Sequence, residues 1–159
     1  MTALSQTNQY LNTHYEGMSR EQLILMLYKG ALERIRLTRQ GIEENNIGKR
    51  GENLSRVIAI ISELNASIDT RINDEGIQFL RGLYRAILAE LPKVSLTNDV
   101  KILDRTEAYI IKLKEIWEKD VMGKNNNVLS ELHSFAKKNP VPSPYGGGET
   151  VNRLNSFAV

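Results

Sequence analysis

The chain has 159 residues, of which 41% are hydrophobic and 25% charged, a composition typical of one globular domain with a core. It has no cysteine and only two histidines, which excludes disulfides and thiolate chemistry and leaves little for a metal or histidine-based catalytic site. The net charge of +2 argues against a dedicated nucleic-acid binder. No targeting segment and no run of the ~20 apolar residues that cross a bilayer is visible, so we expect a cytoplasmic protein.

The first two helices are predicted from a capping motif and from apolar spacing. Ser19 and Gln22 form a capping box at the start of the first helix. This helix is predicted to end at residues 45–48, where asparagine and glycine tolerate left-handed geometry. Apolar residues in steps of three and four over 54–68 predict the second helix, buried on one face.

Two further helices follow, and together the four predict a bundle. The third is predicted over 77–91 and is expected to be terminated by Pro92 and the stretch 93–97. The fourth is predicted to begin after Asn98 or Asp99 and to extend through Trp117. Because the connections are short, successive helices are antiparallel neighbours. The sequence therefore predicts an all-α, up-down four-helix bundle over residues 19–122.

Two flanking segments lie outside this bundle. Residues 1–18 are polar with isolated anchors, among them Tyr10 and Tyr15, and are predicted to form an N-terminal cap on the bundle. Residues 123–159 form a tail with a short amphipathic helix at 127–138 and a flexible end rich in proline and glycine. A helix this short is unstable alone. We expect it either to dock on the bundle, in competition with a client, or to remain free.

No constellation of residues points to catalysis. Neither histidine has the Glu-x-x-His spacing of di-iron bundles, and the chain has no phosphate-binding loop of the Walker type. We therefore expect a protein that is not an enzyme and that needs no cofactor or metal.

Three helices carry more apolar residues than one buried face requires. The fourth has a second apolar row at heptad spacing, and the second and third have apolar residues outside their main stripes. We interpret this surplus as a groove for an apolar peptide, although a core closed by the flanking segments would use the same residues. The predicted client-binding residues are Ile60, Phe79, Leu83, Ile102, Tyr109 and Ile116.

The first helix also carries a motif of a known family. The stretch SREQLILMLYKGAL at 19–32, with its LYKGA motif, resembles the start of the bundle in FliS-type flagellin export chaperones. IISEL at 60–64, followed by SID at 67–69, resembles the end of the family's second helix, and the IW pair at 116–117 resembles its fourth. Tyr10 falls where the family carries an N-terminal tyrosine. Arg20 departs from the usual proline, and the tail after Gly123 is longer than the family needs.

The resemblance implies a cytoplasmic bacterial chaperone that binds the disordered C-terminal segment of flagellin. Such binding would prevent premature polymerisation and present flagellin for flagellar export. The resemblance also implies that the N-terminal segment moves when the client binds, toward the export gate. The residues alone leave a second interpretation open, a self-associating helical scaffold or signalling bundle without a flagellin client.

Overall fold

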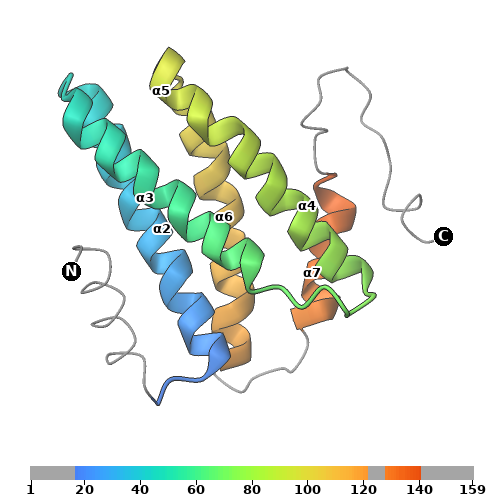
Figure 1. Ribbon diagram of the computed structural model, residues 1–159. Helices are drawn as coiled ribbons and strands as arrows, with labels where there is room; N and C mark the ends of the chain where they lie inside the picture. Colours follow the sequence, from blue (N-terminus) through green and yellow to red (C-terminus); the bar gives the residue numbers. More distant parts are fainter. Residues whose placement is uncertain (1–16, 122–127, 141–159) are drawn as a thin grey trace.

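The computed structural model describes residues 17–121 and 128–140, and every element in them is helical. The helices α2, α3, α4 and α6 run alternately up and down, and α7 lies beside α4 (Figure 1). The prediction of an all-α bundle is therefore confirmed. In chain order the elements are α2 (Arg20–Glu43), α3 (Ile47–Ala66), α4 (Glu75–Glu90), the 3₁₀ helix η1 (Leu91–Lys93), α5 (Val94–Thr97), α6 (Val100–Val121) and α7 (Val128–Lys138).

The N-terminus of α2 is fixed by the capping box that the sequence predicts. The amide of Gln22 donates to the Ser19 hydroxyl (3.2 Å), and the amide of Ser19 donates to the Gln22 side-chain oxygen (2.9 Å). These reciprocal bonds satisfy two amides that the helix itself leaves without partners. Arg20, in place of proline, is compatible with this start.

The turn between α2 and α3 allows the two helices to approach very closely. Asn45 has a φ of 53°, and Asn46 caps α3 by accepting a hydrogen bond from the amide of Lys49 (3.0 Å). Near this turn, a methyl group on Gly41 would lie only 2.6 Å from the amide nitrogen of Arg50. Glycine is therefore required at position 41 because the backbone of α3 occupies the space of a side chain.

The connection between α4 and α6 adds one detail to the sequence analysis. The third helix ends where the sequence predicts, because α4 stops at Glu90, but the chain then continues as η1 and α5. Pro92 is tolerated because it lies in the first turn of η1, where no amide donor is needed. The break comes at Asn98, whose φ of 53° turns the chain into α6.

The core is built around α2, which packs mainly against α3 and α6, whereas α4 packs against α3 and α7. Tyr28 of α2 and Tyr84 of α4 are fully buried, and their hydroxyl oxygens lie 2.6 Å apart. The ring of Tyr28 also meets Trp117 of α6 edge to face, with 5.5 Å between ring centroids. The tyrosine of the LYKGA motif thus joins three helices at the centre of the molecule.

Candidate functional site

The surface of α4 and α6 that α7 covers is the candidate site, and we call it the α4–α6 groove. It includes Gly76 and Phe79 of α4 and Tyr109 of α6. Helix α7 buries Leu132, Phe135 and Ala136 against the bundle and leaves its other face exposed. An amphipathic helix seated between two bundle helices is a helix-in-groove arrangement.

Three aromatic rings from three helices meet in the groove. The ring of Phe135 lies 5.3 Å from Phe79 at 86° and 6.2 Å from Tyr109 at 61°, measured between centroids and ring planes. Edge-to-face pairs of this kind contribute about 0.5–1.5 kcal/mol beyond the area they bury. Phe79 and Tyr109 therefore form a socket for one aromatic side chain of a seated helix.

Two polar contacts hold the seated helix at its edges. His133 Nε2 lies 3.0 Å from Asp74 Oδ1, and Lys119 Nζ lies 3.7 Å from Glu131 Oε1. The second pair is largely exposed, and such pairs stabilise by at most about 1 kcal/mol. The first pair is better shielded, since its side chains are 38% and 23% exposed. Asp74 also caps α4 by accepting hydrogen bonds from the amides of Gly76 (2.7 Å) and Ile77 (3.3 Å).

These hydrogen bonds predict an acid-sensitive contribution from Asp74. Partial burial alone would raise the pKa of this carboxyl, but the bonds from His133, Gly76 and Ile77 outweigh that effect and lower it. A lowered pKa means that ionised Asp74 stabilises the fold above about pH 4 and loses this effect as the pH falls through its folded value. We expect Asp74→Asn to lower the free energy of unfolding at pH 6, with the difference from wild type shrinking toward pH 3. Chemical denaturation at both pH values measures this, and a constant difference would contradict it.

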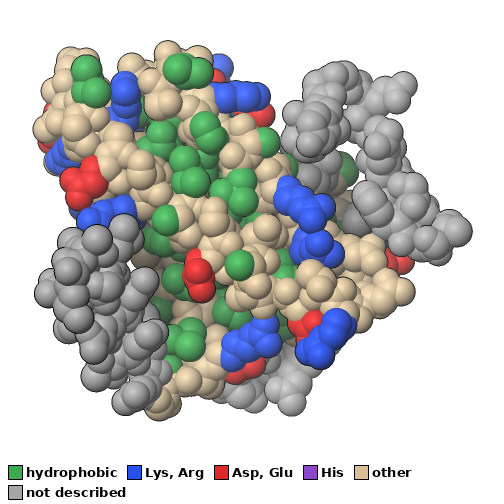
Figure 2. Space-filling view, in the orientation of Figure 1, with side chains coloured by type: hydrophobic (Ala, Val, Ile, Leu, Met, Phe, Trp, Pro, Cys, Tyr) green, Lys and Arg blue, Asp and Glu red, His purple; other side chains and the backbone are tan. Residues whose placement is uncertain are grey.

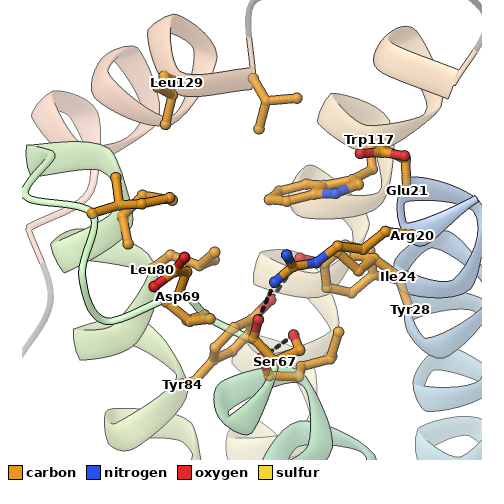
Figure 3. Close-up of a pocket in the computed structure, with 15 residues that line it drawn as sticks. Arg20, Glu21, Ile24, Tyr28, Ser67, Asp69, Leu80, Tyr84, Trp117 and Leu129 are labelled. Carbon is orange, nitrogen blue, oxygen red and sulfur yellow. Dashed lines mark hydrogen bonds between the residues drawn. The ribbon is translucent and has the colours of Figure 1, made fainter.

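A cavity of about 520 Å³ continues the groove beyond the first turn of α7 (Figure 3). Leu129 of α7, Leu80 of α4, Ile24 of α2 and Trp117 of α6 are among its apolar lining. Arg20 extends across the cavity and donates a hydrogen bond to the carbonyl of Ser67. The cavity is thus an apolar space with a polar rim, formed by four helices and the end of α3.

The structure separates the predicted client-binding residues into three groups. Phe79 and Tyr109 come together around Phe135, as described above. Ile60 lies apart from them on the side of α3 that faces α2, where its Cδ1 would be 3.6 Å from a methyl group on Gly30. The other three are 1–4% exposed and, like Phe79, belong to the buried cluster that α7 completes, so substitutions there test stability as well as binding; they are Leu83, Ile102 and Ile116. The assignment of all six to client binding stays a prediction.

A second apolar surface lies away from the groove. Figure 2 shows apolar side chains gathered where α3 and α4 run side by side. Ile58 of α3 and Leu88 of α4 are half-buried residues that pack on the core. The bundle therefore carries further apolar surface outside the groove.

Sequence reasoning missed two polar pairs that the fold creates. The Tyr28–Tyr84 pair was hidden because Tyr28 stands in an apolar run, and burial raises the pKa of both hydroxyls above the usual tyrosine value. The Asp74–His133 contact joins residues far apart in the sequence, and no local pattern signals it. Tyr10 and Tyr15, predicted for the N-terminal cap, lie outside the described residues.

None of the helices in 17–121 and 128–140 is both long and apolar enough to cross a membrane. Within the same ranges, no group of three or more histidine, aspartate or glutamate side chains is placed to hold a metal ion.

Comparison with known proteins matches this chain to flagellar proteins. Residues 3–125 match the family model described as "Flagellar protein FliS". The chain is 29% identical over 106 residues to the flagellar secretion chaperone FliS of Bacillus subtilis, a match that covers 67% of this chain and 78% of that protein. It is 28% identical over 122 residues to the flagellar secretion chaperone FliSB of Pseudomonas aeruginosa, covering 74% and 97%. It is 30% identical over 105 residues to the flagellar secretion chaperone FliS of Escherichia coli, covering 65% and 77%. These relatives are named as chaperones, not as enzymes.

Proposed function

Because the chain belongs to the FliS family of flagellar proteins, we propose that it is a flagellar export chaperone that binds the C-terminal segment of flagellin in the α4–α6 groove. Binding would take place in the cytoplasm, before export, and would keep flagellin from polymerising. The bound segment would then be presented at the flagellar export gate. The N-terminal segment with Tyr10 and Tyr15 is proposed, from the family resemblance, to cap the bundle until the client arrives.

The observation that carries this proposal is the seating of α7. A groove that holds Phe135 between Phe79 and Tyr109 has the width and the apolar lining to hold an amphipathic helix of another protein. A disordered segment that becomes helical loses conformational entropy on binding, so its affinity must come from a large contact area. The apolar surface between α3 and α4 supports such an extended contact.

The proposed mechanism is stoichiometric capping without a chemical step. The chaperone covers apolar client surface that would otherwise drive polymerisation, and release follows from competition at the export gate. The proposal predicts a complex of one chaperone and one client segment. Size-exclusion chromatography with mass measurement, on the full chain mixed with a flagellin C-terminal peptide, tests this directly. A particle that grows with the concentration of the chain alone and ignores the peptide would favour the self-associating scaffold.

Tyr109 gives the sharpest substitution for this test, because it is half-buried in the groove and is not part of the tightly packed core. We expect Tyr109→Asp to weaken binding of the flagellin peptide at least about tenfold, since a charge in an apolar socket is poorly solvated. Titration calorimetry measures the affinity. Ala108→Asp is the matched control, because it places the same charge on the exposed face of α6. Equal loss of affinity in both variants, or unfolding of Tyr109→Asp, would count against the groove.

A further inference from the structure

Helix α7 is attached to the same chain as the groove that it fills. Leu132 is fully buried, and Phe135 occupies the socket of Phe79 and Tyr109. A client segment that used this socket would meet α7 already in place. We propose that α7 is a resident competitor for the α4–α6 groove and that its side-chain pattern is the pattern the groove selects in a partner helix. This inference takes the identity of the client from the proposed function, but the side-chain pattern that the groove selects does not depend on that function.

The contacts of α7 define the chemistry of the partner helix position by position. The positions of Val128 and Leu132 take aliphatic side chains, the position of Phe135 takes an aromatic one, and the position of Ala136 takes a small one. These four positions form one face of a helix. The fit at Leu132 is close, because a methyl group on Gly76 would lie 3.1 Å from its Cβ.

Two polar positions flank this apolar face. The position of Glu131 lies opposite Lys119, and the position of His133 lies opposite Asp74. A partner helix that places an acid opposite Lys119 and a hydrogen-bond donor opposite Asp74 preserves both contacts. The groove therefore selects an amphipathic helix with one acid and one donor at its edges, not any apolar peptide.

Competition follows from the short connection between α6, which forms part of the groove, and α7, which fills it. Only residues 122–127 separate the end of α6 from the start of α7. A ligand tethered by a short connection acts at an effective concentration in roughly the millimolar range. The apparent dissociation constant of an external helix is its intrinsic value divided by the fraction of molecules in which the groove is free. If α7 vacates the groove in about one molecule in ten, the apparent affinity of the client is about tenfold below its intrinsic value.

The decisive variant is Leu132→Asp in the full chain, because it changes α7 and leaves every residue of the groove as it is. Ser134→Asp is the matched control, since Ser134 lies on the exposed face of the same helix and receives the same charge. We expect Leu132→Asp to strengthen binding of a flagellin C-terminal peptide at least about fivefold, and Ser134→Asp to change it less than twofold. Titration calorimetry at constant salt gives both values. If Leu132→Asp lowers the melting temperature too far for titration, His133→Ala replaces it, because it removes the contact to Asp74 and the ring beside Gly76 and leaves the buried apolar face of α7 unchanged.

A second probe separates this inference from the proposed function. A synthetic peptide of residues 127–140 is added to each variant, with the fluorescence of Trp117, the only tryptophan, as the readout. We expect the peptide to bind Leu132→Asp and not the wild-type chain, whose groove is occupied. If flagellin peptide binds neither variant but the 127–140 peptide binds Leu132→Asp, the groove stands and flagellin is the wrong client. If flagellin peptide binds wild type and Leu132→Asp equally, or if the 127–140 peptide binds neither, the inference is overturned.

Discussion

Replacing Tyr84 by phenylalanine is expected to lower the free energy of unfolding by about 1–3 kcal/mol. The substitution removes one hydroxyl and leaves that of Tyr28, which is fully buried, without its partner 2.6 Å away. A buried polar group that loses its hydrogen bond retains the full cost of having left water. Urea denaturation at pH 7 measures the change.

The double substitution Tyr28→Phe with Tyr84→Phe is the control for this prediction. Because it removes both hydroxyls, no buried hydroxyl is left without a hydrogen-bond partner. We therefore expect the double variant to be more stable than either single variant. The pair also gives a signature at high pH. Burial raises both tyrosine pKa values, so wild-type stability falls above about pH 10, where the unfolded chain ionises first. The double variant should lack this fall, and additive single effects would contradict the pairing.

Gly41→Ala is expected to destabilise the protein by about 1–3 kcal/mol or more. The new methyl group would lie 2.6 Å from the amide nitrogen of Arg50 and 2.9 Å from its Cα, and backbone atoms of a packed helix cannot rotate aside. To relieve the overlap, α2 and α3 must separate near their shared turn. Thermal and urea denaturation measure the loss, and the helix content of the folded variant should be unchanged.

Gly82→Ala provides a control with the opposite expected sign. Gly82 lies within α4, and a methyl group there would meet no atom within 4 Å. Alanine in an open helical position stabilises by about 0.4–1 kcal/mol, because it restricts the unfolded chain. A loss of stability in both variants would show that the close approach at Gly41 is not the cause.

The helices were predictable wherever local chemistry decides the structure. The capping box of Ser19 and Gln22 acts within one turn, and the apolar stripes of α3 and α4 have the period of a buried helical face. The end of the third helix before Pro92 was predicted for the same reason, although the sequence did not predict that the chain continues as η1 and α5. Proline ends a helix of α geometry, but a 3₁₀ turn starting near it needs no donor at that position.

The site was less predictable, because it depends on which faces meet. Apolar surplus selected six residues; the structure places Phe79 and Tyr109 beside Phe135 of α7 and Ile60 near α2, while Leu83, Ile102 and Ile116 lie with Phe79 in the buried cluster. Spacing alone does not tell a groove residue from a residue of a broad core face. The polar contacts at the edges of α7 depend on long-range docking, which leaves no local signal in the sequence.

The uneven packing of the helices determines the order in which the molecule comes apart. Helix α2 packs against both α3 and α6, whereas α7 contacts the bundle with one face only. Segments with few buried contacts open at low free energy, while the rest of a protein stays folded. We therefore expect α7 to open and close many times for each global unfolding event. The chain exposes its groove by a local fluctuation and keeps its core closed while it does so.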